Sequence, residues 1–280
     1  LGGLDTPEIA RAFLVPEAPL AQGIVRAKRK LRDNHAPYRI PRPAELPGRL
    51  HVVLSAIYLI YTEGHTATSG DELTRADLST EAIRLSRVLV ELMPDEPEAV
   101  GLLGLLLLTE ARRPARTAPD GSMVRLADQD RSRWDAAMIA EGHDLVRACL
   151  RRDRPGPFQV QAAIAAVHAD APNAEATDWD QVVQLYDLLL TLRPNPVVAL
   201  NRAVALAERD GPAAGVAALE DVQGLDDYQP FHAARADLLA RAGDPTRAAA
   251  AYDRALALTT NAPERAFLSS RRAAMGSPTG

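Results

Sequence analysis

The sequence predicts an all-α protein in which a short helix-turn-helix precedes a long stack of paired helices. Aromatic residues make up only 4% of the chain although 47% of it is apolar. The core must therefore rest on Leu, Val and Ala, which suit close-packed helices better than a β-sandwich. From residue 50 onward apolar residues recur at helical spacing almost throughout, and no convincing alternation typical of strands is present.

Length and composition exclude several classes of protein. A chain of 280 residues predicts one or two domains, or one helical array. The longest apolar runs, at 52–61 and 100–108, are shorter than the ~20 residues that span a bilayer. With no visible secretory signal, we expect a cytosolic protein without a membrane partner. The single cysteine, Cys149, rules out a disulfide framework and a thiolate zinc site, and we expect no cofactor.

The first predicted helix begins at the Thr-Pro-Glu segment at 6–8, which places a hydroxyl N-cap before a proline and an acid. Ile9, Ala12 and Phe13 follow at the i, i+3, i+4 spacing of one helix face. The Leu-Val-Pro segment at 14–16 interrupts this pattern. Because the chain opens on Leu-Gly-Gly rather than Met, we also expect it to be part of a longer protein.

A second helix is predicted over residues 16–32, with Pro19 tolerated in its first turn. Two short helices joined by a tight turn, with basic charge on the second, are typical of a helix-turn-helix. The inner face of the second helix is predicted to hold Leu20, Ile24, Ala27 and Leu31.

Charge is unevenly distributed along the chain. The net charge is −5, yet residues 1–35 hold six basic and four acidic residues, and the remainder holds 26 basic and 33 acidic. The only two lysines, Lys28 and Lys30, lie in the basic cluster. This distribution disfavours a nucleic-acid coat over the whole protein. It leaves open one short basic element on an acidic body, or simply a solvated helix face.

A proline-rich segment separates the two predicted parts. Pro37, Pro41, Pro43 and Pro47 are dense enough to end helices and stiffen a connector. We therefore predict a helix-turn-helix over 1–36, a linker over 37–50 and a helical extension over 51–276.

The extension is punctuated by proline and glycine at regular intervals. Helices are predicted over residues 50–62, 80–93, 96–112, 131–151, 158–169, 178–192, 196–209, 212–222, 228–241, 245–258 and 263–272.

An internal repeat groups these helices in pairs. Tyr186-Asp187 recurs as Tyr252-Asp253 after 66 residues, twice a period of 33. A period near 33–34 with two helices per unit is the tetratricopeptide length. Residues 243–262 resemble that repeat closely, although the first helix of each unit lacks its usual aromatic residue. One helix pair cannot bury its apolar face alone, so we expect a tetratricopeptide-like α-solenoid whose concave surface binds a peptide or another protein.

Residues 1–32 resemble the last two helices of region 4 in bacterial extracytoplasmic-function sigma factors. Glu-Ile-Ala at 8–10, Val-Pro at 15–16 and Arg-Ala-Lys at 26–28 carry this likeness. Residues 38–275 resemble the helical extension of one subgroup of these factors. The segments that carry the second likeness lie at 40–64, 95–98, 128–135, 161–166, 177–179 and 197–204.

The resemblance implies a sigma factor, which joins RNA polymerase core and directs it to the −35 element of promoter DNA. The family's region 2 and the front of region 4 have no counterpart in this sequence, so we do not expect this chain to initiate transcription alone. Because the extension is far longer than the DNA-binding part, we predict that it docks against region 4, region 2 or the polymerase and controls activity in cis. The resemblance also points to a small regulatory protein as a partner.

The family's DNA contacts map onto the second predicted helix. Gln22 could pair with an adenine edge and Arg26 with a guanine. Two departures from the family's pattern, Pro19 and Gly23, put the same promoter contact in doubt. Carried over residue by residue, the base or nearby phosphate contacts are Glu17, Ala18, Gln22 and Arg26, and the phosphate contacts are Lys28, Arg29, Lys30 and Arg32.

No pattern in the sequence favours catalysis. The Glu-Gly-His segments at 63–65 and 141–143 lack the spacing of the helical zinc motif, and surface or capping roles are favoured for their histidines. Cys149 is expected to be a buried small hydrophobe. Trp134 and Trp179 are expected to anchor the core. We therefore do not expect an enzyme.

A cluster of three aspartates is interpreted structurally as well. Asp128, Asp130 and Asp135 lack the glycine and the final glutamate of an EF-hand loop. Helix capping and pairing with Arg131 and Arg133 are the favoured roles.

Two alternatives remain beside a transcription initiation factor. One is a tetratricopeptide-type protein-interaction scaffold without DNA binding. The other is a one-component repressor whose extension binds a small ligand, which a deep apolar pocket would favour. Fold analogy alone does not separate them.

Overall fold

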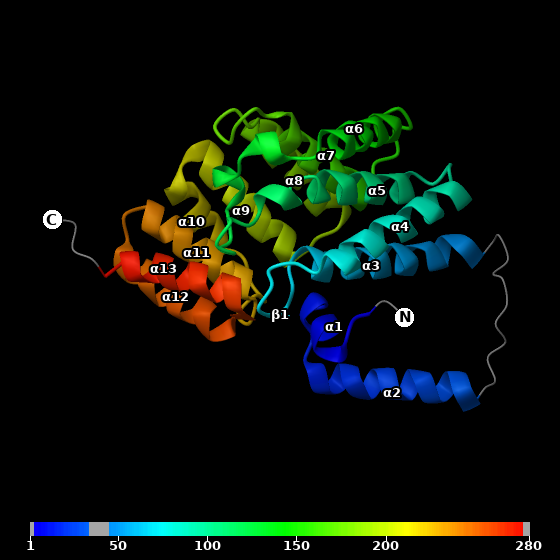
Figure 1. Cartoon of the computed structure of the whole chain (residues 1–280), viewed down its shortest axis with the longest axis horizontal. Helices are drawn as coiled ribbons and strands as arrows, with labels where there is room; N and C mark the ends of the chain where they lie inside the picture. Colours follow the sequence, from blue (N-terminus) through cyan, green and yellow to red (C-terminus); the bar gives the residue numbers. More distant parts are fainter. Residues whose placement is uncertain (1–2, 34–44, 277–280) are drawn as a thin grey trace. The chain divides into compact units, whose positions relative to one another are not determined.

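The computed structural model describes residues 3–33 and 45–276, and within these ranges nearly all regular secondary structure is helical (Figure 1). The predicted all-α class is therefore confirmed. The chain divides into two compact units. The first unit comprises residues 1–68 and 74–88, and the second comprises residues 69–73 and 89–280.

The first unit contains α1 (Thr6–Ala12), α2 (Glu17–Asp33), α3 (Leu46–His65) and most of α4 (Ala76–Leu92). The start of α1 corrects one prediction, because the N-cap is Asp5 rather than Thr6. The Asp5 carboxylate accepts the Glu8 amide at 3.1 Å, and the Glu8 carboxylate accepts the Asp5 amide at 2.7 Å. This reciprocal capping box satisfies two amides that the first turn leaves without intrahelical partners.

Helix α3 is longer than the sequence predicts. It begins at Leu46, so residues 46–50 of the predicted linker form its first turns. Pro47 is accommodated there because the first turn needs no amide donor. Residues 37–44 of the predicted linker lie outside the described residues, and the predicted domain boundaries stay predictions.

The second unit is a succession of helices with proline or a capping residue at nearly every start. All lie within a few residues of their predicted ranges except α6, which begins later because residues 131–133 form a separate 3₁₀ turn and Asp135 caps the helix. The helices are α5 (Pro97–Glu110), α6 (Ala136–Leu150), α7 (Pro157–Asp170), α8 (Trp179–Leu192), α9 (Pro196–Asp210), α10 (Pro212–Glu220), α11 (Gln229–Arg241), α12 (Pro245–Leu258) and α13 (Ala262–Ala274).

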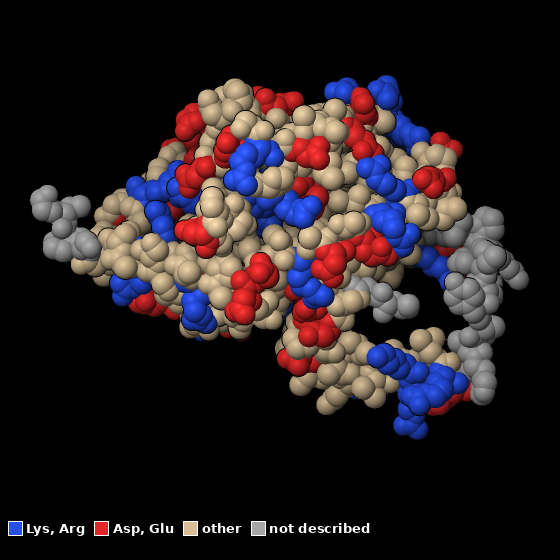
Figure 2. Space-filling view, in the orientation of Figure 1, with Lys and Arg blue, Asp and Glu red and all other residues tan. Residues whose placement is uncertain are grey.

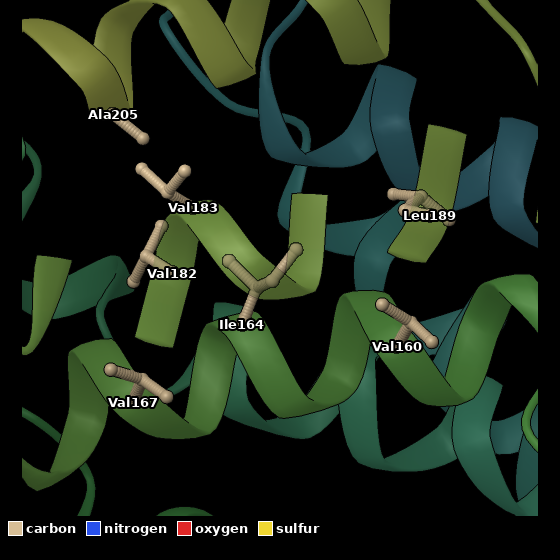
Figure 3. Packing of buried hydrophobic residues seen from close by; sticks show 7 residues of the cluster. All are labelled: Val160, Ile164, Val167, Val182, Val183, Leu189 and Ala205. Carbon is tan, nitrogen blue, oxygen red and sulfur yellow. The ribbon is translucent and has the colours of Figure 1, made fainter. Parts of the chain in front are cut away.

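Consecutive helices of this unit pack against one another, as paired repeats require. Between α7, α8 and α9 the core is made of small and branched aliphatic side chains (Figure 3). No single pair encloses its own core, so each helix depends on its neighbours. The buried members of this cluster are Val160, Ile164, Val167, Val182, Val183, Leu189 and Ala205.

Two glycines allow close contacts between these helices. A Cβ atom at Gly101 would lie 2.7 Å from the Gln159 amide nitrogen, where α5 meets α7. A Cβ atom at Gly142 would lie 2.5 Å from Leu108 Cγ, where α6 meets α5. The glycine of the Glu-Gly-His segment at 141–143 is thus explained by helix packing.

Two short strands correct the expectation of no β-structure. In the second unit β1 (Ser69–Gly70) pairs in parallel with β2 (Thr260–Asn261). Asn261 is fully buried; its side chain donates to the Glu72 carbonyl at 2.8 Å and accepts the Glu264 amide at 3.2 Å. Strands of two residues are too short to show alternation in a sequence.

Within the described residues, no helix has both the length and the apolar character needed to cross a membrane.

Candidate DNA-binding helix and protein-interaction surface

Helix α1 is held in the first unit by two long-range polar contacts. The Glu8 carboxylate accepts a hydrogen bond from Arg75 Nη1 at 2.9 Å, and Arg11 Nη1 donates to the Thr68 carbonyl at 2.8 Å. Burial raises the pKa of the Glu8 carboxyl, although its bond from the Asp5 amide and the nearby Arg75 oppose this shift. Ala10 adds a buried apolar contact. The helix that precedes α2 is therefore fixed.

The turn from α1 to α2 is tight and partly apolar. Leu14 has a left-handed backbone with φ of 53°, and the Val15 amide donates to the Ala10 carbonyl at 3.0 Å. Phe13, Leu14 and Val15 are all more than 40% exposed. Two helices joined by a tight turn are therefore present as predicted, and their assignment as a DNA-binding helix-turn-helix stays a prediction.

Every predicted DNA contact on α2 is exposed, and the helix has no buried residue. Basic side chains gather toward the end of α2 (Figure 2). At 100° per residue, Gln22, Arg26 and Arg29 share one stripe of the helix. The structure thus places Glu17, Ala18, Gln22, Arg26, Lys28, Arg29, Lys30 and Arg32 on the solvent-facing surface of a single helix. Their contact with DNA stays a prediction.

The predicted inner face of α2 is covered only near its start. Leu20 and Ile24 are half-buried, whereas Ala27 is exposed and Leu31 is 62% exposed. The Arg29 and Asp33 side chains form an exposed ion pair at 3.3 Å, which contributes little stability. Gly23 has no neighbour close enough to require glycine.

In the second unit, Asp237 of α11 lies at the centre of a charged surface. Its carboxylate accepts Arg271 Nη2 of α13 at 2.8 Å and lies 3.5 Å from Nη1 atoms of both Arg241 and Arg125. Arg241 also pairs with Glu208 of α9 at 2.5 Å. The first helices of successive pairs are therefore linked by charge on one accessible surface.

Arg125 comes from a segment that sequence reasoning did not single out. Residues 116–124 form a hairpin in which the Val124 amide donates to the Arg116 carbonyl at 2.8 Å. Arg125 holds Asp128 through two bonds, at 2.7 and 3.2 Å. This corrects the predicted partner of Asp128, which was Arg131 or Arg133.

A cavity of about 180 Å³ lies beside this charged surface. It is smaller than the roughly 300–1,000 Å³ typical of ligand pockets, so it does not favour a small-ligand repressor. Its lining combines three separate parts of the second unit, which a local sequence pattern does not reveal. The lining residues are Met123, Gln229, Pro230, Ala233, Glu264, Phe267 and Leu268.

The other aspartates of the predicted cluster are helix caps. Asp130 accepts the Ser132 amide, and Asp135 accepts the amides of Ala137 and Met138. The predicted helix-capping role is therefore confirmed for Asp130 and Asp135. Among the described residues, no group of three or more His, Cys, Asp or Glu side chains is arranged to hold a metal ion.

Arg131 has a packing role instead of an ion pair with the aspartates. Its guanidinium lies 4.6 Å from the centroid of the Trp134 ring. It also donates to the carbonyls of His168 and Ala171, both at 2.6 Å. Trp134 is buried, as expected, whereas Trp179 is half-buried against the cluster between α7 and α9.

Cys149 is buried, and its Sγ lies 3.5 Å from the Pro97 carbonyl, to which it donates. Burial raises the pKa of this thiol to about 11, with Glu98 adding to the effect. A thiol that stays protonated is a poor nucleophile, so the expected role of Cys149 as a buried hydrophobe is confirmed.

Comparison with known proteins defines the fold of this chain. A thermophilic TPR protein of Thermus thermophilus has a similar structure, with a TM-score of 0.53 and 18% sequence identity, over 80% of this chain and 97% of that one. The class is therefore an α-solenoid of tetratricopeptide type.

Two sequence comparisons add to this result. The model of a family of unknown function (DUF6596) matches residues 49–150. An uncharacterized protein of Rhizobium meliloti (strain 1021) is 46% identical over 269 residues, which is 96% of this chain. The chain spans 64% of the length of that relative.

Proposed function

We propose that the helical array of the second unit is a protein-interaction scaffold. The observation that carries this proposal is the charged surface around Asp237, which the first helices of successive pairs share. Stacked helix pairs present extended surfaces of this kind, on which many side chains contact one partner at once. The side chains of these ion pairs are 24–38% exposed, so solvent and a partner can still reach them.

The test is cross-linking of the full-length protein in its own cells, followed by identification of the residues joined. We expect partner cross-links on α9, α11 and α13. These should be lost in Asp237→Asn/Arg241→Gln and retained in the matched surface variant Asp144→Asn/Arg147→Gln on α6. Partners that bind both variants equally well would contradict the proposal.

A second candidate function, transcription initiation as part of a sigma factor, is supported by α2. A fixed α1, a tight turn and a helix whose basic side chains are all exposed suit major-groove recognition. In this proposal Gln22 and Arg26 contact bases, Lys28 and Lys30 contact phosphates, and the helical array regulates polymerase activity through protein contacts. The resemblance of residues 1–32 to sigma region 4 supports the same assignment.

The DNA-binding half of this proposal is tested with Lys28→Gln/Lys30→Gln in the full-length protein. Affinity should fall across DNA sequences alike, and the slope of log K against log salt should flatten by about one unit for each lost phosphate contact. The matched control is Arg147→Gln/Arg254→Gln in the helical array. Unchanged affinity of the lysine variant at low salt would contradict the assignment.

The regulatory half is tested by removing residues 93–280 from the full-length protein, which keeps α1 to α4 and the contacts of α1 with Thr68 and Arg75. We expect altered promoter-driven transcription and altered capture of RNA polymerase core. If both are unchanged, the array has no role in initiation, and only the scaffold proposal stands.

A further inference from the structure

The hairpin at 116–124 and Arg125, here called the hairpin arm (residues 116–125), reaches helices that are distant in sequence. It leaves the end of α5 and contacts α11 and α13, more than a hundred residues later. Its turn is well formed, since the Ala118 amide donates to the Ser122 carbonyl at 2.9 Å and Gly121 takes a φ of +84°. The arm is therefore an ordered extended segment on the surface of other repeats.

Two of the arm's contacts come from side chains of the same face. In an extended segment, residues i and i+2 point to the same side. Met123 lines the cavity between α11 and α13, and Arg125 lies 3.5 Å from Asp237. Met123 thus forms one wall of the cavity, and Arg125 lies beside a carboxylate. An apolar contact and a charged contact two residues apart are how an extended peptide binds a groove.

The arm's contacts can be replaced without disturbing the packing of α11 and α13. Arg125 bonds more closely to Asp128, within its own segment, than to Asp237. Asp237 also pairs with Arg271 and Arg241, neither of which belongs to the arm. The Asp237 side chain is 24% exposed, so another guanidinium can reach it.

We propose that the hairpin arm is a built-in occupant of a peptide-binding groove on α11 and α13. A protein partner displaces the arm by inserting an extended segment with an apolar residue two positions before an arginine. This rests on the scaffold proposal and names the chemistry of its partner. The arm then sets a minimum affinity for the partner, because the partner must compete with a tethered segment that is always present at high effective concentration.

The probe is a fluorescent peptide of residues 114–129 of this chain, added to the full chain. Met123→Ala/Arg125→Ala in the protein should loosen the arm and tighten binding of the native peptide at least tenfold. The matched control variant, Arg147→Ala/Leu150→Ala on the exposed surface of α6, should bind the peptide as weakly as the native chain. A peptide carrying Met123→Ser and Arg125→Ala should bind no variant.

A second measurement uses the unaltered chain and covers the case in which the loosened variant does not fold. Saturating native peptide should speed hydrogen exchange of residues 116–125, notably the Val124 amide, and the altered peptide should not. Equal peptide binding by all variants, or unchanged exchange, overturns the proposal. Because the peptide comes from this chain, the result is independent of whether any external partner is found, which is what decides the scaffold proposal.

Discussion

Helices α2 and α5 differ sharply in how many of their residues are buried. Of the fourteen residues of α5, twelve are buried, and a core of leucines runs through it. Of the seventeen residues of α2, none is buried. Packing therefore decides the side chains of α5, whereas the side chains of α2 are constrained only by helix formation and by whatever the helix contacts.

This difference separates residues that hold the fold from residues free to bind. Substitution in α5 should change stability, and substitution in α2 should change binding with little effect on stability. The basic residues of α2 are consequently a selective target for experiments on function.

The largest expected effect is the difference in stability between two Leu→Ala substitutions, one in α5 and one in α2. Leu106→Ala in α5 removes a side chain that is fully buried, and should lower the free energy of unfolding by about 2–5 kcal/mol. Leu31→Ala in α2, where the leucine is 62% exposed, should change it by no more than about 0.5 kcal/mol. Urea unfolding followed by circular dichroism measures both. A cost at Leu31 equal to that at Leu106 would show that α2 is packed in solution.

A smaller effect concerns pH and depends on His168 of α7. Burial, with help from Arg112 and Arg131, lowers the pKa of this imidazole to about 4. In the unfolded chain its pKa is about 6.5, so between these values the unfolded state binds the extra proton. Stability therefore falls as the pH drops from 6.5 toward 4, by about 2 kcal/mol at pH 4.5.

The measurement for His168 is urea unfolding at pH 7 and at pH 4.5. His168→Gln removes this contribution while leaving every carboxylate in place, so its stability should depend less on pH than that of the native chain. An equal loss in both proteins would show that the imidazole is not responsible.

A pair of glycine substitutions should have effects of opposite sign in α5 and α2. Gly101→Ala in α5 forces a Cβ against the Gln159 backbone and should cost about 1–3 kcal/mol. Gly23→Ala in α2 meets only the Arg26 side chain, at 4.0 Å, and should stabilise the helix by up to ~1 kcal/mol. Thermal unfolding gives both signs. Destabilisation by Gly23→Ala would indicate a close neighbour for that face.

Helix positions could be predicted well from the sequence because each boundary has a local cause. Pro196, Pro212 and Pro245 each stand in the first turn of a helix, where a missing amide costs nothing. The N-cap of α1 was wrong by one residue because Asp5 and Thr6 are both good caps, and only the bond to the Glu8 amide distinguishes them.

The non-local features could not be predicted in the same way. Asp128 pairs with Arg125 rather than with Arg131, although both arginines are three residues away in the sequence. Arg131 instead contacts the Trp134 ring and donates to the carbonyls of His168 and Ala171. The groove at Asp237 depends on helices brought together by stacking, so no short motif marks it. The exposed residues of α2 were predictable because a basic stripe has few ways to be buried.

The pairing of β1 with β2 has a consequence for how the molecule opens. A linear array normally frays from its last repeat, which has a neighbour on one side only. Here residues 69–73 lie against that terminal repeat, and Asn261 is fully buried at the junction. The end of the array is thus tied to a segment almost two hundred residues earlier, and it should be lost together with the rest of the second unit in one cooperative step rather than unravelling by itself.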